Sequence, residues 1–162
     1  MTNGAIDGKL REFELVQDRA SALQSKGIVD VGTKTEIQDY RRILYHEMAH
    51  LLETESDKKA NNEWIWERSN GKLARINDLV EPNKAVYNNN EIAVDDKFYR
   101  AYTGKYYGDP AKFKDRTGDW NASATEIYSI GLEHFASKDM MVMLYAKDRE
   151  HFDRMQTLLE SL

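Results

Sequence analysis

The residues with the clearest chemical potential are His46, Glu47 and His50, which form the pattern HExxH. Side chains four residues apart lie on the same face of a helix, so His46 and His50 can bind one metal ion together. Glu47 is turned about 100° from His46 around the helix axis, which places its carboxylate beside such an ion. There it can take a proton from a water molecule that the metal activates. The pattern therefore predicts a metal-dependent hydrolytic centre.

The composition restricts which side chains can complete that centre. The chain of 162 residues contains no cysteine and 4 histidines. Disulfides, thiolate zinc sites, iron–sulfur clusters and cysteine nucleophiles are therefore excluded. Any metal must be held by histidine and carboxylate. Zinc accepts two imidazoles and one carboxylate and, in catalytic sites, keeps a fourth position open for water. We therefore expect one Zn²⁺ ion per chain.

The segment 43–52, which surrounds the HExxH pattern, resembles the active-site signature of the zincins, a superfamily of zinc-dependent metallopeptidases. The glycine and third histidine that continue this signature in metzincins are missing after His50. The resemblance therefore implies a carboxylate as the third ligand. It also implies peptide-bond hydrolysis, with Glu47 as the general base, on a peptide or protein substrate.

A later segment, residues 124–131, is similar to the ligand helix of gluzincins, which include thermolysin-like enzymes and lethal-factor-like toxin peptidases. The resemblance is carried by Thr125 and Glu126, followed by an apolar residue and a tyrosine. It implies that Glu126 is the third ligand, beside His46 and His50. The thermolysin-like pattern has an aspartate four residues after this glutamate, whereas this chain has Ile130.

Two other glutamates remain open as the third ligand. Glu133 lies seven residues after Glu126 and so on nearly the same helix face, where it is either the ligand or the acceptor that orients a ligating histidine. Glu53 lies three residues after His50 and suits an orienting or capping role better. The alternative for each candidate glutamate is that it is an ordinary solvent-exposed side chain on a helix, without a role at the metal. The other two histidines, His134 and His151, are expected at the surface.

Residues 98–107 contain four of the nine tyrosines of the chain. The lethal-factor-like resemblance implies a tyrosine shortly before the third ligand, which would stabilise the oxyanion that forms as water attacks the carbonyl. Tyr106 or Tyr107 is the candidate, although each lies about 20 residues before Glu126, further than the resemblance implies. The alternative is that these tyrosines pack on a half-buried sheet face.

Apolar periodicity, capping patterns and turn residues predict the elements that must position these side chains. They indicate a single α+β domain over residues 1–162, a compact, mainly helical, zincin-like fold with a small sheet. In zincins an edge strand that precedes the HExxH helix pairs with the substrate, and residues 27–31 are the upstream candidate. The expected helices are 8–25, 34–55, 58–69, 122–137 and 148–162, and the expected extended segments are 27–31, 85–87 and 92–94, with a turn at 88–90 and a loop at 109–119.

The charge balance limits the partners. Lys and Arg number 23 against 28 Asp and Glu, giving a net charge of −5, which argues against nucleic-acid binding. No apolar run approaches the roughly 20 residues that cross a bilayer, and the first residues lack the pattern of a signal peptide. We therefore expect a soluble or cytoplasmic protein without a membrane partner; the oligomeric state is left open.

Two further hypotheses remain beside the peptidase. One is a zincin-like structural or assembly module of the phage- or prophage-encoded type, in which zinc joins two helices without a usable cleft. The other is a toxin or effector protease domain, cut from a longer polypeptide, with one protein target.

Overall fold

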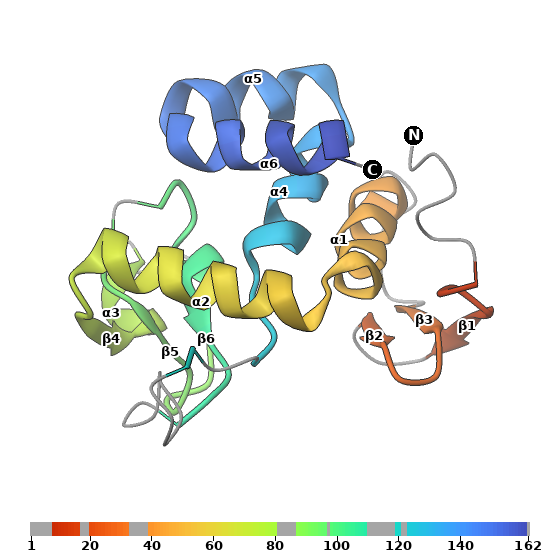
Figure 1. The fold of residues 1–162 in the computed structure, drawn as a ribbon. Coiled ribbons are helices and arrows are strands. Elements are labelled where there is room, and N and C mark those ends of the chain that lie inside the picture. Colours follow the sequence, from red (N-terminus) through yellow and green to blue (C-terminus); the bar gives the residue numbers. More distant parts are fainter. Residues whose placement is uncertain are drawn as a thin grey trace. The chain divides into compact units, whose positions relative to one another are not determined.

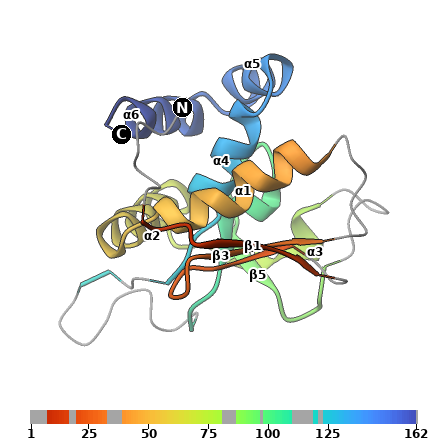
Figure 2. The same cartoon turned by 90° about the vertical axis from the view of Figure 1, so that its right-hand side faces the viewer.

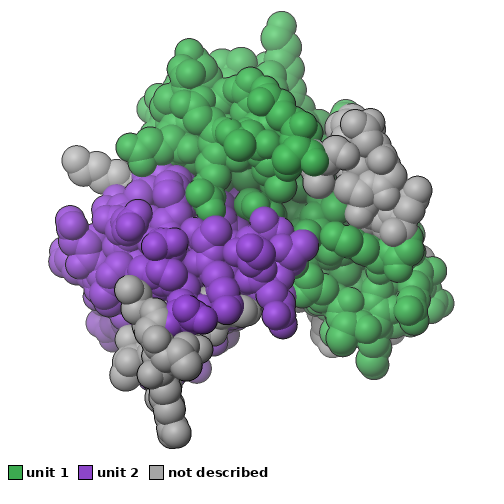
Figure 3. All heavy atoms as spheres, viewed as in Figure 1, with its two compact units in different colours: residues 1–53, 128–162 green, residues 54–127 purple. Residues whose placement is uncertain are grey.

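A computed structural model describes residues 8–16, 20–32, 39–80, 87–96, 98–109, 119–120 and 123–161. The protein has an α+β fold, as predicted, with short strands and longer helices (Figure 1). The chain divides into two compact units, residues 1–53 with 128–162, and residues 54–127 (Figure 3).

The first unit begins with a three-stranded sheet formed by β1 (Glu12–Val16), β2 (Ser21–Leu23) and β3 (Ile28–Gly32). The strand order is β1-β3-β2, with β1 parallel and β2 antiparallel to β3. The strand predicted at 27–31 is thus confirmed as β3. It is the central strand of the sheet, with β1 and β2 at its edges, so it does not offer the free edge that was expected of a strand that pairs with substrate.

The helix predicted over residues 8–25 is wrong, because this segment forms β1, β2 and the turn that follows. Its apolar residues have helical spacing, yet Phe13 is 51% and Leu23 40% exposed. The turn at Gly27 depends on glycine, since φ is +69° and a Cβ there would lie 2.2 Å from the carbonyl oxygen of Lys9. Pairing with the buried strand β3 outweighs the local periodicity.

Helix α1 (Tyr40–Leu52) carries the HExxH pattern and lies against this sheet (Figure 2). Its Leu51 joins Val29 and Val31 of β3 in a buried apolar cluster, onto which Tyr40 and Leu44 also pack. This contact fixes which face of α1 is turned toward the sheet.

The expected start of this helix near residue 34 lies outside the described residues. Its end, expected at about 55, comes at Leu52, where Glu53 becomes extended. Gln24 Nε2 donates to the carbonyl oxygen of Glu53 at 2.6 Å, and Lys9 Nζ to that of Leu52 at 3.4 Å. These donors satisfy carbonyls that the end of a helix leaves without helical partners.

From residue 127 on, the described chain forms the helices α4 (Ile127–Phe135), α5 (Lys138–Lys147) and α6 (Arg149–Ser161). Helices were expected at 122–137 and 148–162, so α4 is shorter than predicted and α5 was not anticipated. Helix α4 packs closely on α6, because a Cβ at Gly131 would lie 2.3 Å from Met155 Sδ.

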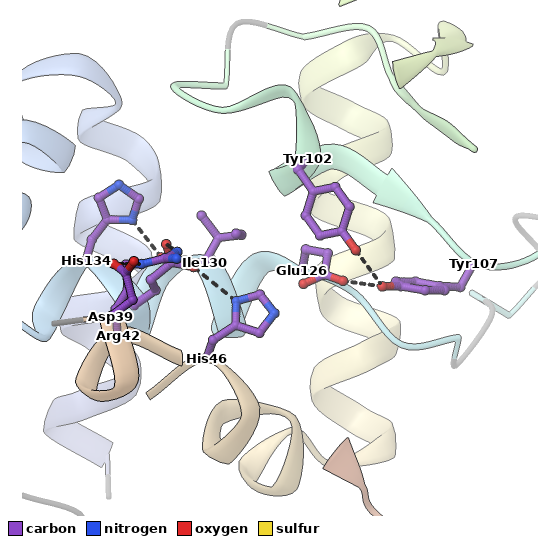
Figure 4. Close-up of polar contacts among 9 residues, drawn as sticks. Asp39, Arg42, His46, Tyr102, Tyr107, Glu126, Ile130 and His134 are labelled. Carbon is purple, nitrogen blue, oxygen red and sulfur yellow. Dashed lines mark hydrogen bonds and ion pairs between the residues drawn. The ribbon is translucent and has the colours of Figure 1, made fainter. Parts of the chain in front are cut away.

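The prediction that His134 and His151 lie at the surface is wrong, because they are 3% and 1% exposed. His134 Nδ1 lies 2.7 Å from the carbonyl oxygen of Ile130, one helical turn earlier (Figure 4). The backbone N–H of His151 donates to Asp148 Oδ1 in the first turn of α6. Both histidines are therefore buried, and the His134 ring has the polar partner expected of a buried histidine.

The second unit begins with α2 (Glu55–Ser69), which confirms the helix predicted at 58–69. A capping box between Thr54 and Asp57 starts it, three residues earlier than predicted. It ends at the predicted Asn70–Gly71 pair, with Asn70 in the left-handed region and a Cβ at Gly71 excluded by the ring of Trp66.

A second three-stranded sheet follows, formed by β4 (Leu73–Arg75), β5 (Ile92–Val94) and β6 (Lys105–Tyr106) in the antiparallel order β4-β5-β6. The short helix α3 (Ile76–Leu79) and the 3₁₀ turn η2 (Ala101–Gly104) lie in its connections. Strand β5 and the turn before it were predicted. The strand expected at 85–87 and the loop at 109–119 lie largely outside the described residues.

Within the part of the chain that the structure describes, no helix is both long enough and apolar enough to span a membrane.

Candidate metal centre

Helix α1 presents His46 and His50 on one face, as their spacing predicts. Their ring centroids are 5.3 Å apart and the rings meet edge to face, at 78°. Both side chains are half-buried. Two imidazoles one helical turn apart provide half of a tetrahedral zinc site.

A buried carboxylate on α4 orients the first of these histidines. Glu133 is 2% exposed, and its Oε2 lies 3.1 Å from His46 Nδ1. A carboxylate accepts hydrogen bonds, so the proton is on Nδ1 and the Nε2 of His46 is left with the lone pair that binds a metal. Of the two roles left open for Glu133, this geometry matches that of the acceptor.

Glu133 is in turn held by Arg42, whose Nη1 donates to Oε1 at 2.5 Å. Burial opposes the charge on the guanidinium, but the hydrogen bond and the attraction of Glu133 prevail and raise the pKa of Arg42. Arg42 also contacts Asp39 at 3.5 Å (Figure 4). Sequence reasoning missed Arg42, although it lies four residues before His46 and therefore on the same helix face.

Glu126 supplies the third side chain. It immediately precedes α4, so its backbone continues directly into the helix that carries Glu133. One ligand atom from each of His46, His50 and Glu126 lies within 4.8 Å of the others, which makes them a group that could hold one metal ion. Tetrahedral bonds of about 2.1 Å place ligand atoms roughly 3.4 Å apart, a separation that falls within the 4.8 Å range of this group.

Glu126 is buried, at 1% exposure, and a tyrosine hydroxyl engages its carboxylate. Tyr107 donates a hydrogen bond to Glu126 Oε1, and its own oxygen lies 3.5 Å from the hydroxyl of Tyr102 (Figure 4). Burial and the adjacent carboxylate raise the pKa of Tyr107 well above its ordinary value, so the phenol keeps its proton. Tyr107 directly follows β6, whose pairing with β5 fixes this part of the chain.

A lysine extends these contacts. Lys105 Nζ donates to Tyr102 at 3.0 Å and to Glu91 Oε1 at 2.7 Å, and it lies 4.4 Å from the centroid of the Tyr107 ring. Although burial opposes its charge, these hydrogen bonds raise the pKa of Lys105. We call Glu91, Lys105, Tyr102 and Tyr107 the tyrosine–lysine chain. The sequence did not predict these contacts, because a single lysine among tyrosines forms no recognisable pattern.

The remaining candidates lie as follows. Glu47 is on α1, at 7% exposure and therefore shielded from bulk solvent. Glu53 is 1% exposed at the end of α1, and it is not a member of the group that could hold a metal. Tyr106 is 4% exposed, and a Cβ at Gly108 would lie 2.3 Å from its hydroxyl, whereas the neighbouring Tyr107 reaches Glu126.

Comparisons with models of protein families, with characterised proteins and with solved structures show no significant similarity to this chain.

Proposed function

We propose that this protein is a zinc-dependent metallopeptidase. The observation that carries the proposal is that one ligand atom from each of His46, His50 and Glu126 lies within 4.8 Å of the others, while Glu47 follows the first histidine on α1. Two imidazoles and one carboxylate are the ligand set of hydrolytic zinc sites that keep a position open for water. When bound, the ion supplies Lewis acidity, which polarises a carbonyl group and makes water more acidic.

The side chains of the protein have distinct roles in this proposal. His46 and His50 bind through ring nitrogens, and Glu133 keeps His46 in the tautomer that can bind. Glu126 contributes a negative charge that attracts a cation. Glu47 accepts the proton of the attacking water and transfers it to the leaving amine, as a single carboxylate can do in successive steps.

The test is Glu47→Gln, which keeps the size of the side chain and removes its basicity. We expect full zinc content with loss of peptide hydrolysis by a factor of about 100 or more, as for removal of a general base. Activity would be measured as cleavage of a mixed peptide library, followed by mass spectrometry. Glu63→Gln, an exposed change on α2, is the matched control and should match the wild type.

The structural or assembly module makes the opposite prediction. In that case zinc stabilises the fold, the wild type cleaves no peptide, and Glu47→Gln is indistinguishable from it. An effector protease is recognised by a third result, in which the library stays intact while one protein of a cell extract is cut in a manner that depends on Glu47.

A further inference from the structure

The hydroxyl group of Tyr107 is the starting point. A phenol has one proton to donate, and here it is donated to Glu126 Oε1. While that hydrogen bond is made, Tyr107 cannot donate to an oxyanion. The geometry therefore favours a role for Tyr107 that acts through Glu126, and this differs from the oxyanion role expected from the sequence.

We infer that Tyr107 is a positioning residue that restricts Glu126 to binding the metal through a single oxygen, Oε2. The inference rests on the proposed function, because it concerns the same zinc site. A carboxylate free on both oxygens can bind zinc through one or through both. A hydrogen bond to Oε1 withdraws electron density from that oxygen and occupies space beside it, so ligation through Oε2 alone is favoured.

The consequence is an open coordination position. Two imidazoles and one carboxylate oxygen are three ligands, and a tetrahedral ion then retains one position for water. A carboxylate bound through both oxygens would occupy that position. Tyr107 would thus decide whether the site has the coordination of a catalytic centre or of a closed one.

The surroundings of Tyr107 favour a fixed phenol. Tyr107 is 48% exposed, so burial alone does not hold its ring. Its oxygen is 3.5 Å from that of Tyr102, which accepts from Lys105, and the lysine ammonium lies near both tyrosine rings. Glu91 anchors the lysine at 2.7 Å. The tyrosine–lysine chain therefore runs from the Glu91–Lys105 ion pair through the two tyrosine hydroxyls to Glu126.

The test compares Tyr107→Phe with the wild type after zinc has been replaced by cobalt. Loss of the hydroxyl frees Oε1 to take the position of the water, so we expect the visible absorption bands of the bound cobalt to shift and to stop responding to added azide, which binds at an open position. We also expect zinc affinity to fall about 10-fold, which is the usual effect of removing a partner of a metal ligand. Tyr102→Phe should shift the spectrum in the same direction by less. Tyr145→Phe, which removes a hydroxyl from a tyrosine of similar exposure on α5, should change neither quantity.

The outcomes separate the two proposals. If the wild type binds zinc and Tyr107→Phe has the same cobalt spectrum and zinc affinity, the positioning role is refuted while the metallopeptidase remains. If the wild type binds no zinc, the metallopeptidase fails, and the positioning role fails with it. Circular dichroism of each variant checks that it folds.

Discussion

Replacing Glu133 by glutamine tests how the first histidine is oriented. The amide keeps the shape of the side chain but carries no charge. If its oxygen accepts from His46 Nδ1, the hydrogen bond loses its charged acceptor. If its NH₂ group faces Nδ1 instead, the imidazole must carry its proton on Nε2, where the metal should bind. Both arrangements weaken zinc binding.

The size of the effect follows from the contacts. A hydrogen bond to a charged group contributes about 1.5–3 kcal/mol, which corresponds to roughly 10- to 100-fold in zinc affinity. The lost pairing with Arg42 should lower the free energy of unfolding by about 1–2 kcal/mol. This is less than the 3–5 kcal/mol for breaking a fully buried pair, because Arg42 is 32% exposed and, in the second of the two amide arrangements, the glutamine oxygen still accepts its hydrogen bond.

The assay is a competition titration of zinc between the protein and a chromogenic chelator at pH 7.5. Glu63→Gln, on the exposed side of α2, controls for the general effect of removing a negative charge. Zinc affinity of Glu133→Gln equal to that of the control would refute the orienting role of Glu133.

Three further results are expected. Lys105→Met should lower the free energy of unfolding in urea by about 2–3 kcal/mol, since it leaves the partly buried Glu91 without its cation. Lys72→Met, at an exposed pair, should lower it by less than about 1 kcal/mol, and equal effects would contradict the partly buried pairing. The raised pKa of Lys105 means that its stabilisation is complete below the ordinary lysine pKa of 10.5 and is lost as pH rises through the higher folded-state value, so the difference between wild type and Lys105→Met should shrink above pH 10.5. Gly131→Ala should lower the free energy of unfolding by about 1–3 kcal/mol, because the added Cβ would overlap Met155, and this outweighs the higher helix propensity of alanine. If thermal unfolding showed a more stable variant, Met155 would have to move aside freely.

The sequence predicted those elements whose local signals agree with their packing. Helix α2 ends at Asn70–Gly71, the signal that predicted its end, whereas its start at Glu55 lies three residues before the predicted one. The segment 8–25 has helical spacing as well, but its backbone pairs with β3, a contact that no local pattern contains. The pairing depends on residues up to 16 positions away, beyond the reach of periodicity.

The residues of the candidate site also differ in how far the sequence could predict them. His46, Glu47 and His50 were found because helix geometry alone relates them. Glu126 came from a resemblance, and its proximity to the histidines is a property of the fold. Spacing could not decide between Glu126 and Glu133 as the third ligand. Two carboxylates expected on the same face of one helix are equally possible partners of the histidines.

The zinc content of the purified protein tests the proposed metal centre most directly. After exhaustive dialysis, elemental analysis should find about one zinc per chain in the wild type and almost none in His50→Ala or Glu126→Ala, each verified as folded. A wild type without zinc, even after reconstitution, or a Glu126→Ala variant that retains one tightly bound zinc, would contradict the assignment of His46, His50 and Glu126 as the ligands.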